Sequence, residues 1–97
     1  MDRQAEDVVL LDLTGLAAFA DYFVIATATS ERQISALVDA VVDAAPGLRV
    51  RREGGTEGGW VLVEVGPVVA HLFSREQRAY YDLEGLWQRA HEVVRVQ

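Results

Sequence analysis

The segment 60–65 reads W-V-L-V-E-V, with a valine at every second position. Successive side chains of a β-strand point to opposite faces of a sheet, so this alternation predicts a strand whose three valines share one buried face. The other face carries Trp60, Leu62 and Glu64. A large aromatic side chain beside a carboxylate is typical of protein interfaces. We therefore expect a sheet with one core face and one face that contacts another macromolecule.

Other apolar stretches extend this sheet. Strands are expected at 8–13, 22–27, 48–53, 60–65 and 68–73, and helices after Ser30 and Ser74. The order β-β-α-β-β-β-α requires a parallel crossover around the first helix and antiparallel neighbours across the short turns. We therefore predict an α+β fold, a single-layer mixed β-sheet of about five strands packed with helices. Its topology resembles that of a nucleotidyltransferase without the metal site.

Both helices begin at a serine that is followed three residues later by a glutamine. Ser30 with Gln33, and Ser74 with Gln77, match the S-x-x-Q capping box, in which side chains satisfy free backbone donors. These four residues are assigned as structural caps. An apolar stripe at helical spacing follows each cap. It consists of Ile34, Leu37, Val38, Val41 and Val42 in the first helix, and of Tyr80, Leu83, Leu86, Trp87 and Ala90 in the second.

The length of 97 residues, of which 51% are hydrophobic, predicts a single domain over residues 1–97. Residues 92–97 are expected to form a flexible tail. The absence of cysteine excludes disulfides and thiolate metal ligands and fits a reducing compartment. The start is charged, unlike a signal peptide, and no apolar run could span a bilayer. We expect a cytoplasmic protein without membrane contact.

The net charge of −6 opposes broad attraction to nucleic acid and favours a basic protein partner. A charge of this size more often serves only to keep a small protein soluble.

A basic cluster is the exception to this acidic balance. Arg49, Arg51 and Arg52, together with Arg75 and Arg78, could form a positive patch for RNA. The alternative, which we favour, is an edge strand whose charges prevent association with other strands. We expect no direct sequence-specific binding of nucleic acid.

Candidates for catalysis are few. The histidines, His71 and His91, are far apart in the sequence and belong to no zinc-binding motif. No serine lies in a G-x-S-x-G elbow. We therefore assign no catalytic residue, no metal and no cofactor. His71 alternates with apolar neighbours and is expected to be a half-buried, hydrogen-bonded structural residue, and Trp87 to belong to the core.

A nucleotidyltransferase-like enzyme that uses Asp12 and Asp21 is the alternative. Two-metal phosphoryl transfer needs carboxylates close enough to share the ions, and no predicted strand carries two carboxylates at alternate positions. Aspartates in such places more often form turns or caps.

Four sequence blocks resemble the Iojap/RsfS family, the ribosomal silencing factors. They are D-Y-F-V-I-A-T-x-T-S-E-R-Q at 21–33, the strand that begins at Trp60, H-L-F at 71–73 and Y-D-L-E-x-L-W at 81–87. The resemblance runs from about Asp7 to Trp87.

Members of this family bind the fourteenth protein of the large ribosomal subunit, at the face where the small subunit docks. The resemblance thus implies a translational repressor that blocks subunit joining without catalysis, in particular during starvation. Homodimerisation is a further implied property. By motif position, the strand of Trp60, Leu62 and Glu64 is the expected contact centre. Tyr81, Asp82 and Glu84 are expected as secondary contacts, with carboxylates facing basic residues of the ribosomal protein.

The chain departs from the family pattern in three places. Only six residues precede Asp7, where the family usually has a helical segment, so we expect a shortened chain or a compact member. Ala28 replaces a usual glycine. Pro67 replaces an acidic residue, which reduces the negative charge of the expected contact surface.

Overall fold

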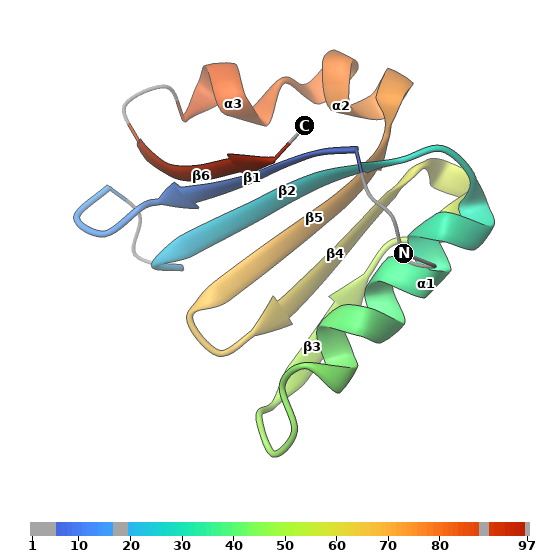
Figure 1. Ribbon diagram of the computed structural model, residues 1–97, viewed down its shortest axis with the longest axis horizontal. Coiled ribbons are helices and arrows are strands. Elements are labelled where there is room, and N and C mark those ends of the chain that lie inside the picture. Colours follow the sequence, from blue (N-terminus) through green and yellow to red (C-terminus); the bar gives the residue numbers. More distant parts are fainter. Residues whose placement is uncertain (1–5, 17–19, 88–89, 97) are drawn as a thin grey trace.

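The structure is a computed structural model that describes residues 6–16, 20–87 and 90–96. A six-stranded sheet has helices on both faces (Figure 1). The strands are β1 (Glu6–Asp12), β2 (Tyr22–Ala28), β3 (Val50–Glu53), β4 (Trp60–Val65), β5 (Val68–Ser74) and β6 (His91–Val96). The helices are α1 (Glu31–Asp43), α2 (Arg75–Tyr81) and α3 (Leu83–Leu86), with a short 3-10 helix, η1 (Thr56–Gly58), before β4. In the described ranges, no helix is long and apolar enough to cross a membrane.

The strand order is β3-β4-β5-β2-β1-β6, and only the central pair, β2 and β5, is parallel. Short turns join β3 to β4 and β4 to β5, which makes those neighbours antiparallel, whereas β2 reaches β5 through α1 and two strands. The mixed α+β fold predicted from the sequence is confirmed, with one strand more than expected.

The two sheet faces carry separate cores. The three alternating valines of β4 pack with Ile34, Leu37 and Val38 of α1 on one face. The opposite face contains Phe23, Ile25, Val69 and Phe73, against which Leu83 and Trp87 pack. The core position of Trp87 is therefore confirmed. Because β4 directs Trp60, Leu62 and Glu64 toward this second face, the alternation predicted for the strand is also confirmed.

The predicted cap of α1 is present, with one difference in its partner. Ser30 Oγ accepts a hydrogen bond from the backbone N–H of Gln33 at 3.1 Å. The Gln33 side chain accepts from the backbone N–H of Thr29 rather than from that of Ser30. The cap of α2 is similar, since Ser74 Oγ accepts from the Gln77 N–H at 3.2 Å. The α1 stripe is narrower than predicted because Val42 is exposed.

The long second helix predicted from Ser74 onward is wrong. Asp82 adopts the left-handed conformation, with φ of 47°, and divides the segment into α2 and α3. The Asp82 side chain then accepts from the Gly85 N–H at 3.2 Å and caps α3. The break rotates the apolar stripe, so that Tyr80 and Leu86, which were expected in the core, are 79% and 71% exposed.

The predicted C-terminal tail is a strand. Residues 91–96 form β6, which pairs antiparallel with β1 at the edge of the sheet. The register shifts at Val93, between the partners Leu10 and Leu11, and this irregularity interrupts the alternation that identifies a strand in a sequence. Residue 97 lies outside the described part of the chain.

Candidate docking surface

Trp60 lies at the centre of an aromatic cluster rather than alone on a surface. Its ring stacks on Phe73 with centroids 5.0 Å apart and contacts Tyr81 at 4.4 Å. The indole N–H donates a hydrogen bond to Nδ1 of His71 at 3.2 Å. The side chain is half-buried. The sequence-based picture of a free aromatic anchor is therefore wrong in one respect, because part of Trp60 supports the fold and only the remainder can contact a partner.

His71 explains how Trp60 is held. Only 4% of this residue is exposed, which is more buried than the sequence predicted. Burial lowers the pKa of His71 from 6.5 to about 4, because a charged imidazole would lose its hydration. The ring is therefore neutral at physiological pH, with Nδ1 free to accept from the Trp60 indole. Its Nε2 is buried and has no hydrogen-bond partner within the described residues.

Two exposed tyrosines extend the surface beyond Trp60. Tyr81 contacts the indole and is 45% exposed. Tyr80 packs edge-on against Tyr81 with centroids 5.0 Å apart and is almost entirely solvent-exposed. Exposed aromatic rings in contact with one another are characteristic of interface centres. We define the docking surface as Trp60, Leu62, Glu64, Tyr80 and Tyr81.

Tyr80 was missed in the sequence because an uninterrupted helix would have buried it. The one local signal that could have revealed the break is Asp82 followed three residues later by Gly85, since aspartate at an N-cap accepts from the third following N–H.

The two carboxylates predicted as secondary contacts have intramolecular roles. Asp82 is the cap of α3, as described above. Glu84 forms ion pairs with Arg78 at 2.9 Å and with Arg95 at 3.2 Å. The hydrogen bond from Arg78 lowers the pKa of Glu84, so its carboxylate stays charged and bound to that arginine. Its charge is compensated within the chain, so Glu84 is placed outside the docking surface.

Arg78 is a structural residue rather than part of a positive patch. It is 8% exposed and donates to the hydroxyl of Thr27 at 2.7 Å and to the backbone carbonyl of Asp7. With its ion pair to Glu84, it connects β1, β2 and α3. Arg75, the other helix arginine considered for RNA, forms an exposed ion pair with Glu6. Neither residue faces outward as a free cation.

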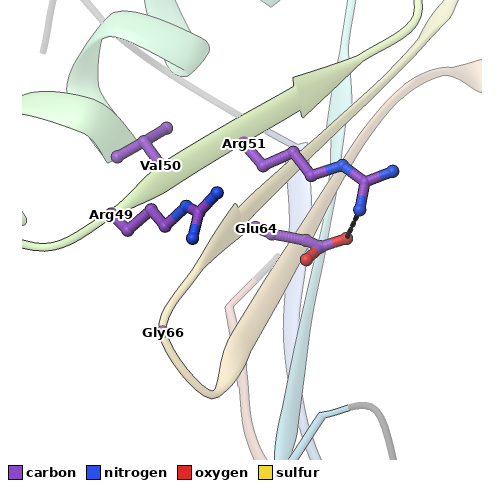
Figure 2. Close-up of a pocket in the computed structure, with 5 residues that line it drawn as sticks. All are labelled: Arg49, Val50, Arg51, Glu64 and Gly66. Carbon is purple, nitrogen blue, oxygen red and sulfur yellow. Dashed lines mark ion pairs between the residues drawn. The ribbon is translucent and has the colours of Figure 1, made fainter.

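Glu64 borders a basic cavity next to the docking surface. A space of about 510 Å³ is lined by Arg49, Val50, Arg51, Glu64 and Gly66 (Figure 2). Figure 2 shows the Arg51 guanidinium directed at the Glu64 carboxylate, 4.0 Å away. Arg51 also pairs with Glu53 at 2.5 Å. The negative charge of Glu64 is thus shared with an arginine of the same chain before any partner arrives.

The two aspartates considered for phosphoryl transfer lie at the ends of neighbouring strands, Asp12 at the end of β1 and Asp21 before β2. Asp12 accepts from the Thr14 backbone N–H at 2.9 Å, as turn-forming aspartates do. Asp21 is exposed and precedes β2. No group of His, Cys, Asp or Glu that could hold a metal ion occurs among the residues that the structure describes.

A second cavity, of about 280 Å³, lies where the parallel strands β2 and β5 lead into α1 and α2, the position at which many α/β proteins bind nucleotides. Its lining includes Glu31, Glu57 and Glu76. Three carboxylates repel phosphate, so this geometry does not favour a nucleotide.

Comparisons with known proteins all point to the same family. The family model described as "Ribosomal silencing factor during starvation" matches residues 1–97. Ribosomal silencing factor RsfS of Bacillus subtilis is 43% identical over 89 residues, which cover 89% of this chain and 75% of that protein. A mouse protein named mitochondrial assembly of ribosomal large subunit protein 1 is 34% identical over 91 residues, covering 88% of this chain and 40% of its own length.

The fold agrees with this relationship. A crystal structure of a protein from Chromobacterium violaceum superimposes with a TM-score of 0.81 at 36% sequence identity, covering 90% of this chain and 75% of that chain. The match over the full sequence and the shared fold show that this chain belongs to the RsfS family of ribosomal silencing factors.

Proposed function

We propose that the protein is a cytoplasmic translational repressor that binds the large ribosomal subunit through its fourteenth protein and blocks the small subunit sterically. The observation that carries the proposal is the docking surface, in which the exposed Tyr80 and Tyr81 of α2 extend the half-buried Trp60 of β4. The family name and the name of the mouse relative both refer to the ribosome, the latter to its large subunit.

The aromatic cluster supports protein binding in particular. Tyr80 contacts Tyr81, which in turn contacts Trp60. A partner that covers these three rings therefore buries a continuous apolar area. Tyrosine and tryptophan provide large contact areas at low entropic cost, and central aromatic residues usually contribute most to binding. Because the hydrogen bond to His71 fixes the indole, Trp60 is already ordered before binding, which reduces that cost further.

The charge distribution supports a basic partner to a limited extent. The chain carries a net charge of −6, which accelerates encounter with a cationic surface. Glu64 is the acidic residue inside the docking surface, and a basic residue of the partner would compete there with Arg51. We therefore propose that the net charge raises the rate of association, whereas the aromatic surface provides the affinity.

The proposed action requires no catalysis. Occupation of the joining face is sufficient, since a protein of this size excludes a second large particle from the area that it covers. Association with a second copy of the chain stays a prediction from the family resemblance.

The test is binding to the isolated ribosomal protein in the absence of RNA, measured by calorimetry. We expect specific binding by the unmodified chain and weaker binding by Tyr80→Ala. Leu48→Ala is the matched control, because Leu48 is an exposed apolar residue in the α1–β3 connection, outside the docking surface. Equal affinities for the two variants and the unmodified chain would contradict the assigned surface, and absence of any binding would contradict the proposed partner.

A further inference from the structure

The edge strand β3 and the residue before it concentrate positive charge on an otherwise acidic chain. Arg49, Arg51 and Arg52 are all exposed at this edge. Arg51 is neutralised by Glu53 and Glu64. Arg49 and Arg52 form no ion pair within the described residues, so two uncompensated guanidinium groups remain at the edge.

Most other arginines that the structure describes are paired with carboxylates, unlike Arg49 and Arg52. Arg75, Arg78 and Arg95 each pair with carboxylates of the chain. Arg32, on α1, resembles Arg49 in being exposed without an ion pair among the described residues, but it stands apart from the β3 edge. Of these unpaired arginines, Arg49 lines the basic cavity beside Glu64. Arg52 lies opposite Val63 in the β3–β4 ladder and therefore on the α1 face of the sheet, away from Glu64 and Trp60.

The arginine edge adjoins the docking surface. Arg51 lies opposite Glu64 in the β3–β4 ladder, and Glu53 lies opposite Leu62. A further cavity of about 190 Å³, lined by Glu53, Gly54, Trp60 and Leu62, continues from this edge toward the aromatic cluster. A partner that binds Trp60 and Leu62 therefore also brings the molecules around it close to β3.

We propose that Arg49 binds a phosphate group of ribosomal RNA that flanks the protein partner. This inference rests on the proposed function, because ribosomal proteins lie on RNA and a chain docked on one of them meets phosphates at its rim. Guanidinium groups bind phosphate through paired hydrogen bonds that a point charge cannot form. Figure 2 shows the Arg49 guanidinium turned into the basic cavity, with Glu64 and Arg51 on its far side.

The same charges explain why RNA is a second partner rather than the first. Glu53 and Glu64 lie next to the arginines, and the whole chain carries a net charge of −6. The net negative charge of the chain repels free RNA. In the docked complex, the phosphates already lie near the β3 edge. Only the charges close to them act there, because salt screens interactions beyond about 8 Å. The contact forms after the aromatic surface has docked.

The experiment compares Arg49→Gln with Arg32→Gln, a matched control that also removes one exposed positive charge. Affinity for purified large subunits is measured by co-sedimentation at several salt concentrations. Each phosphate contact contributes about 0.7 to 0.9 to the slope of log affinity against log salt. We expect Arg49→Gln to lower this slope by about 0.7 to 0.9, and the control to retain the slope of the unmodified chain. Thermal unfolding should be the same for all three.

Three results would overturn the inference. An unchanged slope in Arg49→Gln shows that this arginine does not contact phosphate. A slope lowered equally by Arg32→Gln shows a general effect of net charge. Weaker binding of Arg49→Gln to the RNA-free ribosomal protein assigns this arginine to protein carboxylates instead. The proposed function survives each of these results, whereas failure of the unmodified chain to bind large subunits would overturn both.

Discussion

The indole N–H of Trp60 donates a hydrogen bond to Nδ1 of His71, with the two nitrogens 3.2 Å apart. The two residues lie on adjacent strands, and Trp60 is diagonal to His71 because its direct partner in the ladder is Phe73. The hydrogen bond links the most buried polar ring of this face to the residue at the centre of the docking surface. Trp60 therefore has a structural role as well as the proposed role in binding, and substitutions must separate the two.

Trp60→Ala is expected to destabilise the domain. The substitution removes ring contacts with Phe73 and Tyr81 and leaves Nδ1 of His71 without its donor. For a half-buried tryptophan we expect a loss of about 2 to 3 kcal/mol in the free energy of unfolding, measured by urea denaturation. Trp60→Phe keeps most of the packing and should lose about 1 kcal/mol. If Trp60→Ala had the same urea midpoint as the unmodified chain, this result would contradict the packing role of Trp60.

The stability of the protein should decrease as the pH falls from 6.5 to about 4. His71 has its pKa lowered from 6.5 to about 4 in the folded state, so over this interval the unfolded chain binds a proton that the folded chain does not. The free energy of unfolding should fall by at most about 1.4 kcal/mol per pH unit and then level off with respect to this group. Glu84, whose pKa is lowered from 4.5, acts at lower pH.

His71→Gln is the control for this pH dependence. Glutamine does not titrate, and its side-chain oxygen can accept from the Trp60 indole. The slope between pH 6.5 and about 4.5 should therefore be reduced in this variant. An identical slope in both proteins would show that another group causes the pH dependence.

Arg78→Met should be strongly destabilising. The substitution retains much of the aliphatic stem but leaves the Thr27 hydroxyl and the Asp7 carbonyl without this donor and removes one of the two arginines that pair with Glu84. Leaving a buried acceptor without its donor costs about 1 to 3 kcal/mol. Arg75→Met is the matched control, because its ion pair with Glu6 is exposed and its loss should leave the thermal midpoint unchanged. Equal midpoints for the two variants would refute the structural role of Arg78.

These residues show which parts of the structure a sequence can reveal. The valines of β4 and the two serine caps depend on short-range patterns, namely alternation and an i to i+3 hydrogen bond, and both were predicted correctly. The roles of Arg78 and Glu84 depend on contacts between β1, β2 and α3, which no local pattern contains. The exposure of Tyr80 depends on one left-handed residue, Asp82, which ends a helix that its neighbours would otherwise continue.

The edge strand β6 illustrates a further limit. Residues 91–96 pair with β1, far away in the sequence, and the shifted register at Val93 removes the regular alternation. Strand pairing of this kind is selected by tertiary structure rather than by local preference. For the same reason the sequence indicated that Trp60 faces outward but could not show that His71 would hold it.

Tyr80→Ala should weaken binding to large subunits without affecting folding. Tyr80 is 79% exposed, so its removal leaves the core intact, whereas the ring lies at the outer part of the docking surface. We expect a loss of about 1 to 2 kcal/mol, corresponding to a roughly five- to thirtyfold weaker affinity in co-sedimentation. The thermal midpoint measured on the same sample verifies that the variant is folded. An affinity equal to that of the unmodified chain would remove Tyr80 from the docking surface.

The central claim is that the docked protein prevents the two ribosomal subunits from joining. Sucrose-gradient analysis of purified small and large subunits, mixed with increasing amounts of the protein, tests it directly. The account predicts that the fraction of joined ribosomes falls as the large subunit becomes occupied, and that Tyr80→Ala requires a higher concentration for the same effect. If the fraction of joined ribosomes stayed undiminished while they carried the bound protein, this result would contradict the central claim.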